Sequence, residues 1–408
     1  MVHRLGQPVA ALDRPSLALD FARYSALPPS LSFSRASTAW GFDFTEYAAD
    51  IPRLSAKGLL IEGQRTNHVS DSTFSAADAG DGALPAGVSV IKNGTAAAVT
   101  VAKATVASGN TVDIRIAGAA SFSNGFVNFL LMPPGSVTGI SQSDKIAAAI
   151  DLALVAGDYD DADRLGFLLT ERDSGGGFER TTDFTENLHL TPSLARYGGT
   201  LSVSDAHTVQ AESALATSGW ASSAVIDYTL RLRNPQVEVA SFTSSPILTA
   251  GSALTRAADV ASVPLGDWFN GSEGALLVEA EMYALSDGHL LSLCDGSTDN
   301  AVALTLDSSG NVRAVTQAGG SEQAVVGSGT VSAGSAFKAA LSYDGNRLHC
   351  CLNGGPVSSS TATFPTMGAL TRLGVGSAVS TAFIFGHIKR AAYWTDALTA
   401  NRLRELTT

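Results

Sequence analysis

The sequence predicts an all-β protein built from two antiparallel jelly-roll β-sandwiches in tandem. Apolar and polar residues alternate along many short segments, turn-forming pairs such as Asn93-Gly94 separate those segments, and helical patterns are scarce. In the segment 226–233 (IDYTLRLR) the alternation is strict, which gives one apolar and one polar strand face. Short strands at this spacing favour sandwiches over units in which strands alternate with helices.

Three sections are expected in the 408 residues. Residues 1–63 mix short strands with proline-rich stretches, residues 64–250 form a first strand-rich block, and residues 251–408 form a second. One short helix is expected at 399–406, because Thr399 can cap its first turn and apolar residues follow at helical spacing.

The composition narrows the range of partners. Charged residues make up 16% of the chain and the net charge is −12, so nucleic acid and anionic membrane surfaces are not expected ligands. The first residues lack the apolar core of a secretory signal, and synthesis in the bacterial cytoplasm is expected. Cys294, Cys350 and Cys351 are expected to be reduced and partly buried, since they are odd in number and two are adjacent.

Two groups of segments in the first 260 residues resemble one family. They are 33–39 (FSRASTA), 51–53 (IPR) and 58–67 (GLLIEGQRTN), and then 234–238 (NPQVE), 243–249 (TSSPILT) and 254–259 (LTRAAD). They resemble head-spike fibre proteins of phages and gene transfer agents, in which a short N-terminal attachment module precedes a carbohydrate-binding-type jelly roll. At 68–70 (HVS) the chain departs from the family pattern, which runs on with Leu and Asn. We expect these segments to build the domain frame and not the ligand site.

The end of the chain resembles a laminin-G-like, concanavalin A-like sandwich. The resemblance lies in the strand at 337–341, the turn at 343–345 (YDG), the hairpin at 348–355 (LHCCLNGG) and the run at 385–394 (FGHIKRAAYW) before the short helix. It implies a fold and no particular activity, because lectins, adhesins and glycanases share it.

A sugar site needs an aromatic ring for the apolar face of the pyranose and polar groups that converge on its hydroxyls. The candidate residues for carbohydrate binding are Trp220, Tyr197, Arg196, Asp227 and Arg231. Trp220 stands among small residues, and it either lies exposed in a loop or caps the core. Trp268 and Trp394 have apolar neighbours and are expected to pack internally.

Other chemistry has weaker support. No cofactor is expected, although a structural calcium ion is an alternative at the carboxylates Asp158, Asp160, Asp161 and Asp163, which otherwise form a solvated acidic loop. Glu279 and Glu281 are the nearest match to the alternating acids of a glycanase, but the expected third acid is missing. The spacings of a zinc site, a hydrolase nucleophile turn and a P-loop are absent from the sequence, so no enzyme activity is expected.

The expected function is therefore that of a virion spike or fibre subunit that binds host capsular or surface polysaccharide. The implied partners are capsid or tail proteins, and homo-oligomers are expected because weak sugar contacts gain from multivalency. Two alternatives remain open: a capsule-degrading glycanase or deacetylase on the same scaffold, and a purely structural decoration protein.

Overall fold

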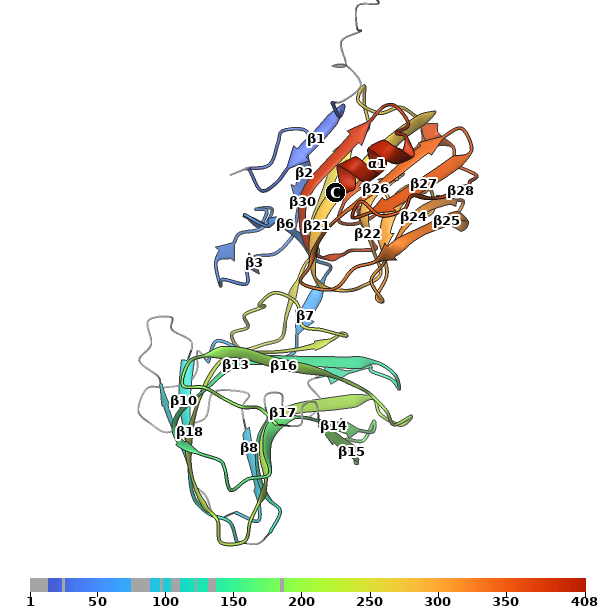
Figure 1. Cartoon of the computed structure of the whole chain (residues 1–408). Helices are drawn as coiled ribbons and strands as arrows, with labels where there is room; N and C mark the ends of the chain where they lie inside the picture. Colours follow the sequence, from blue (N-terminus) through green and yellow to red (C-terminus); the bar gives the residue numbers. More distant parts are fainter. Residues whose placement is uncertain are drawn as a thin grey trace, which may run out of the picture. The chain divides into compact units, whose positions relative to one another are not determined.

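The computed structural model describes residues 14–23, 26–74, 89–95, 98–103, 111–121, 123–130, 137–183 and 187–408. The chain divides into two compact units, each shown in Figure 1. Unit 1 comprises residues 1–38, 46–64 and 257–408, and unit 2 comprises residues 39–45 and 65–256. Unit 2 is therefore inserted in the sequence of unit 1.

Two antiparallel sheets form unit 1. The first runs in the order β28-β27-β26-β21-β30-β6-β5, with β1 also paired to β30. Its strands are β1 (Leu17–Asp20), β5 (Leu54–Ser55), β6 (Gly58–Ile61), β21 (Glu273–Ala284), β26 (Ala336–Asp344), β27 (Arg347–Leu352), β28 (Ser358–Thr361) and β30 (Phe385–Trp394). The second runs in the order β2-β20-β29-β22-β23-β24-β25. Its strands are β2 (Ser32–Ser34), β20 (Val260–Pro264), β22 (Gly288–Cys294), β23 (Ala301–Leu306), β24 (Asn311–Ala318), β25 (Ser321–Thr330) and β29 (Arg372–Val375).

The core of unit 1 lies between these sheets and includes side chains from both ends of the sequence. Leu19, Phe21 and Ile61 pack in the same buried cluster as Leu304 and Leu341. A one-turn 3-10 helix, η1 (Met367–Ala369), precedes β29. The helix α1 (Ala400–Thr407) covers part of the outer face of the first sheet (Figure 1). The expected cap is confirmed, because the Thr399 side chain accepts a hydrogen bond from the Arg402 N–H.

Unit 2 is also a two-sheet sandwich. A five-stranded sheet runs β16-β13-β18-β10-β9, a six-stranded sheet runs β15-β14-β17-β11-β8 with β12 also paired to β17, and β7 pairs with β19. The strands are β7 (Arg65–Asn67), β8 (Ser89–Asn93), β9 (Ala98–Lys103), β10 (Thr111–Ala119), β11 (Gly125–Leu130), β12 (Val137–Thr138), β13 (Lys145–Asp158), β14 (Arg164–Arg172), β15 (Phe178–Asp183), β16 (Ala195–Ser202), β17 (Gln210–Trp220), β18 (Val225–Val239) and β19 (Leu254–Arg256). Two further short strands are β3 (Ala39–Trp40), which belongs to unit 2, and β4 (Glu46–Tyr47), which belongs to unit 1.

The predicted alternation is clearest in β18. Ile226, Tyr228, Leu230 and Leu232 are buried in the core of unit 2, and the intervening polar residues face outward. A bulge interrupts the pairing of β13 with β18 near Asn234, whose φ of 50° lies in the left-handed region. The all-β sandwich class predicted from the sequence is confirmed.

The N-terminal segment differs from its expectation as a separate module over residues 1–63. Its strands β1, β2, β5 and β6 complete the two sheets of unit 1, because their apolar side chains fill the same core as β21 and β30. The chain passes between the units at 38/39, 45/46, 64/65 and 256/257, and the last two crossings lie near the expected boundaries at 63/64 and 250/251. Residues 1–13 and 24–25 of that segment lie outside the described residues.

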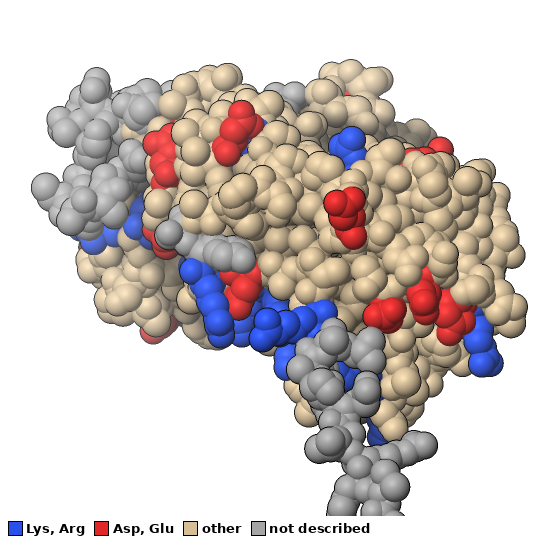
Figure 2. All heavy atoms as spheres, turned by 90° about the horizontal axis from the view of Figure 1, so that it is seen from above, with Lys and Arg blue, Asp and Glu red and all other residues tan. Residues whose placement is uncertain are grey.

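The state of the cysteines and the sparse charge on the surface can be compared with what the composition predicts. All three cysteines are free of disulfides, and they are fully buried where partial burial was expected. Figure 2 shows one face of the molecule on which wide areas carry neither acidic nor basic side chains. Within the described part of the chain, no helix has the length and apolar character needed to cross a membrane.

Candidate functional site

The outer face of the five-stranded sheet in unit 2 carries paired charges. Arg115 of β10 binds the Asp227 carboxylate through Nε and Nη2, each at 2.9 Å, and Arg231 of β18 binds Asp113 through the same two nitrogens, each at 2.8 Å. These hydrogen bonds raise the pKa of Arg115 and Arg231 and lower the pKa of Asp227. Asp227 and Arg231, both predicted sugar contacts, are therefore already engaged by protein groups.

A groove of about 310 Å³ lies over β13 and β16, beside the segment that follows β18. It is lined by Ala148, Ala149, Arg196, Gly198, Gly199, Thr200, Phe242 and Thr243. The lining therefore combines one aromatic ring, two hydroxyls, exposed backbone and one charged side chain. Arg196 is the predicted site residue that the structure places in this groove.

Glycine keeps the floor of the groove low. A Cβ atom at Gly198 would lie 2.6 Å from the Ala148 carbonyl oxygen and 2.9 Å from the Ala149 Cβ atom. Any larger residue would therefore force β16 away from β13. The close approach of these strands leaves backbone atoms accessible where a side chain would otherwise stand.

The two terminal nitrogens of Arg196 form hydrogen bonds with neighbouring protein groups. Its Nη1 donates to Asp151 Oδ1 at 3.2 Å and to the Asn234 carbonyl oxygen at 2.6 Å, and its Nη2 donates to Gln236 Oε1 at 3.3 Å. Burial lowers the pKa of Arg196, and the neighbouring Asp151 carboxylate opposes that effect. Asp151 also accepts a hydrogen bond from Arg233 Nε at 2.9 Å, so one carboxylate serves two guanidinium groups.

The segment after β18 supplies the aromatic ring. Phe242 is half-buried, and the Arg65 guanidinium lies 5.3 Å from its ring centroid. The buried Glu238 carboxylate anchors this segment by accepting hydrogen bonds from Ser244 N at 3.1 Å and Ser244 Oγ at 2.8 Å. Burial raises the pKa of Glu238. Sequence reasoning missed Phe242, and the available signal was an aromatic residue among hydroxyl residues directly after a strand.

The expectation that Trp220 forms a sugar platform is wrong. Its side chain is fully buried and stacks on Tyr228, with ring centroids 6.0 Å apart and an interplanar angle of 11°. The alternative of a core aromatic holds, because Trp220 ends β17 with its ring turned into the sandwich.

Tyr197 also packs against the core, and its hydroxyl donates to the His189 carbonyl oxygen at 3.2 Å. Tyr197 is not among the groove residues, since side chains alternate along β16 and Arg196 takes the outer face.

The alternative of a calcium site at the acidic loop gains no geometric support. Asp158, Asp160, Asp161 and Asp163 are exposed, and no three of their carboxylates bring oxygens within 4.8 Å of one another. This arrangement agrees with the solvated loop expected for these residues.

Three other residues, which were not predicted from the sequence, do bring possible metal-ligand atoms this close together. Among the described residues, Glu179, Asp205 and His207 bring ligand atoms within 4.8 Å of one another. The loop that carries Asp205 is fixed by the buried Glu171 carboxylate, which accepts hydrogen bonds from Asp205 N at 3.0 Å and from Thr208 Oγ1 at 2.9 Å. Burial acts to raise the pKa of Glu171, but these bonds together lower it.

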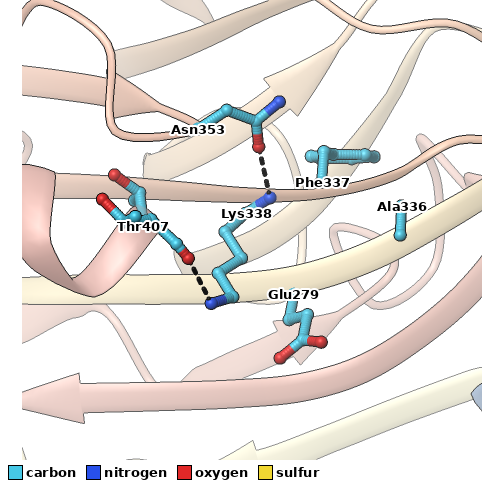
Figure 3. A pocket seen from close by; sticks show the side chains of 7 residues that line it. Glu279, Ala336, Phe337, Lys338, Asn353 and Thr407 are labelled. Atoms are coloured by element: carbon cyan, nitrogen blue, oxygen red, sulfur yellow. Dashed lines mark hydrogen bonds between the residues drawn. The ribbon is translucent and has the colours of Figure 1, made fainter.

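A second pocket, of about 290 Å³, lies on the outer face of unit 1 and includes Glu279 (Figure 3). Lys338 crosses it and donates from Nζ to an oxygen of Thr408 at 2.7 Å. Glu279 accepts a hydrogen bond from Lys389 Nζ at 2.7 Å, and Glu281 accepts one from Lys57 Nζ at 2.5 Å. The two acids of the glycanase alternative therefore share a sheet face, as their spacing predicts, and each is paired with a lysine.

Several solved structures resemble parts of the chain at low similarity. The carbohydrate-binding module of the Ruminococcus gnavus IT-sialidase bound to α2,3-sialyllactose matches with 18% identity and a TM-score of 0.30, covering 34% of this chain and 83% of the module. A xylan-binding domain of Paenibacillus barcinonensis Xyn10C matches with 14% identity and a TM-score of 0.29, covering 44% and 96%. Domains LG4-5 of the mouse laminin α1 chain match with 12% identity and a TM-score of 0.25, covering 69% and 88%.

Sequence comparison gives one family match. No curated protein matches the chain. Residues 236–404 match the model described as the concanavalin A-like lectin/glucanases superfamily, which is less than half of the chain. This match agrees with the resemblance quoted for the end of the sequence, and the strand composition of unit 1 fits it. Residues 236–404 of this protein are therefore similar to the concanavalin A-like lectin/glucanases superfamily.

Proposed function

We propose that this protein is a carbohydrate-binding subunit of a phage or gene-transfer-agent particle, where it attaches the particle to host surface polysaccharide. The observation that carries the binding part is the groove over β13 and β16, in which Phe242, hydroxyl groups and Arg196 line one preformed depression.

The chemistry of this groove suits a sugar ring. A pyranose presents an apolar C–H surface and a rim of hydroxyls, and an aromatic ring beside a few oriented polar groups binds both. Thr200 Oγ1 donates to the Ser241 carbonyl oxygen at 3.0 Å, so the hydroxyl is oriented and its lone pairs remain available as acceptors. Arg196 is fixed by its contacts with Asp151 and Asn234, so its orientation adds little entropic cost on binding.

The particle part of the proposal rests on the resemblance of the segments at 33–67 and 234–259 to head-spike fibre proteins. It implies a place on the particle surface, capsid or tail proteins as partners, and a homo-oligomer in which several weak sites act together. In this proposal residues 1–63 provide the attachment to the particle. Immunogold labelling of purified particles with an antibody to this chain tests the location, and label absent from intact particles would contradict it.

We further propose binding without turnover. The lysine partners of Glu279 and Glu281 support this part, because a glycanase needs one carboxyl group that can donate a proton and one that can attack or activate water. The decoration-protein alternative differs from ours in one measurable way, since it requires no affinity for any glycan.

The binding experiment uses the purified full chain on an array of bacterial surface polysaccharides. The variant Phe242→Ala removes the groove ring, and we expect it to weaken binding about tenfold or more. The matched control is Phe178→Ala, which removes a 63% exposed ring from β15 of the other sheet. Equal losses in the two folded variants, or no glycan bound by the wild type, would contradict the proposed function.

A further inference from the structure

We propose that the groove in unit 2 selects acidic sugars, and that a sugar carboxylate binds the Nε–Nη2 edge of Arg196. This inference rests on the proposed carbohydrate binding and adds the ligand class.

The hydrogen-bonding capacity of Arg196 is only partly used. A guanidinium group has five N–H donors. Arg196 uses Nη1 toward Asp151 and Asn234 and Nη2 toward Gln236, and among the described residues its Nε donates to no acceptor. The side chain is 31% exposed and lines the groove. The Nε hydrogen and one of the two Nη2 hydrogens therefore have no acceptor among the described residues.

Two other arginines on the same sheet face use the corresponding edge of their guanidinium groups to bind carboxylates. Arg115 and Arg231 each use Nε together with Nη2 to hold the two oxygens of an aspartate, at distances of 2.8 to 2.9 Å. A fork of two parallel N–H donors matches a carboxylate in geometry and in charge. Arg196 differs because its protein carboxylate, Asp151, bonds to Nη1 and leaves the fork free.

The charge in the groove favours the same ligand. Arg196 is the one charged residue among the eight described lining residues. Its nearest counter-ion, Asp151, also bonds to Arg233, and the Glu238 carboxylate acts on Arg196 electrostatically as well. The chain as a whole carries a net charge of −12, which repels polyanions. Binding of an acidic polysaccharide would therefore depend on this local site and not on the overall charge.

The test compares each polysaccharide that binds on the array with its carboxyl-reduced form, in which uronic acids become neutral hexoses and the linkages stay intact. We expect acidic polysaccharides to bind, and carboxyl reduction to weaken binding of the full chain by about tenfold or more, measured by titration calorimetry. We also expect higher salt concentration to weaken binding of the native form more than binding of the reduced form.

Two variants make the assignment specific. Arg196→Lys keeps the positive charge and removes the fork, and we expect it to lose the discrimination between native and reduced polysaccharide. Arg115→Lys is the matched control, because its fork already holds Asp227, and it should discriminate like the wild type.

Each outcome decides a different claim. Binding of neutral glycans, or equal binding before and after carboxyl reduction, would overturn this inference and leave the proposed carbohydrate binding in place. Discrimination retained in folded Arg196→Lys would overturn the role of Arg196. Binding of no polysaccharide by the folded wild type would overturn the proposed function and this inference with it.

Discussion

Arg35 donates a hydrogen bond from Nη1 to Asp259 Oδ1 at 3.0 Å, and both side chains are fully buried although 224 positions separate them in the sequence. The Asp259 carboxylate also accepts from Arg53, and Arg53 in turn pairs with Glu62 at 2.6 Å. Tyr283 donates its hydroxyl hydrogen to Glu62. This buried network joins the points where the chain leaves unit 1 and returns to it.

The network predicts a large loss of stability when its central carboxylate is removed. Asp259→Ala leaves two buried guanidinium groups without their shared partner, and we expect the free energy of unfolding of unit 1 to fall by about 3 to 5 kcal/mol. Urea unfolding of the full chain, monitored by fluorescence of the tryptophans in unit 1, measures this loss. The control is Glu405→Ala in the exposed pair with Arg402 of unit 1, for which we expect about 1 kcal/mol or less. Similar losses in both variants would contradict a structural role for the buried network.

The frame of the protein could be predicted because it depends on short-range patterns. Alternation along β18 and turn pairs such as Asn93-Gly94 indicated the sandwich class, and Thr399 indicated the start of α1. The segments that resemble the spike fibre family contain Arg35, Arg53, Glu62 and Asp259, which build the frame of unit 1. The segment 243–249 differs from the expectation, because its Thr243 lines the candidate groove.

The candidate site could be predicted only in part, because it depends on contacts that no local pattern encodes. Arg196 was identified, but Asp227 and Arg231 turned out to be engaged by Arg115 and Asp113 across strands. Trp220 follows a glycine and precedes small residues, as a loop aromatic would, yet β17 continues to it and turns the ring inward. The insertion of one unit into the other follows from pairing between strands such as β6 and β30, hundreds of residues apart.

The insertion predicts which fragments fold. Residues 65–256 contain both sheets and the core of unit 2, so we expect them to give a cooperative thermal transition when expressed alone. Residues 251–408, the expected second domain, lack β1, β2 and β6, whose apolar side chains fill the core of unit 1. We expect this fragment to aggregate or to unfold without cooperativity. A stable fragment 251–408 with the melting temperature of unit 1 in the full chain would contradict this prediction.

The paired state of Glu279 and Glu281 predicts no hydrolysis. Each carboxylate accepts a hydrogen bond from a lysine, Lys389 or Lys57, and the third acid of the alternating glycanase pattern is missing from the sequence. We expect the full chain to release neither reducing ends nor acetate from any polysaccharide that it binds, measured over hours at micromolar protein. Release of reducing ends that is abolished in Glu279→Gln and Glu281→Gln would contradict this prediction and favour the glycanase alternative.

The stability of unit 1 should fall in mild acid because of the buried His289, together with His387, whose pKa burial also lowers to about 4. The His289 side chain on β22 is 7% exposed, and burial lowers its pKa from 6.5 to about 4. Between those values the unfolded chain binds a proton that the folded chain does not, so the free energy of unfolding falls as the pH falls from about 7 to 4. The shift corresponds to about 3 kcal/mol.

His289→Gln removes the titrating group, and the difference in unfolding free energy between pH 7 and pH 4 should be smaller by this amount than in the wild type. Ser292→Ala, at a buried position without a titrating group on the same strand, is the control and should keep the acid sensitivity of the wild type. Equal acid sensitivity in the wild type and in His289→Gln would show that the buried imidazole is not the cause.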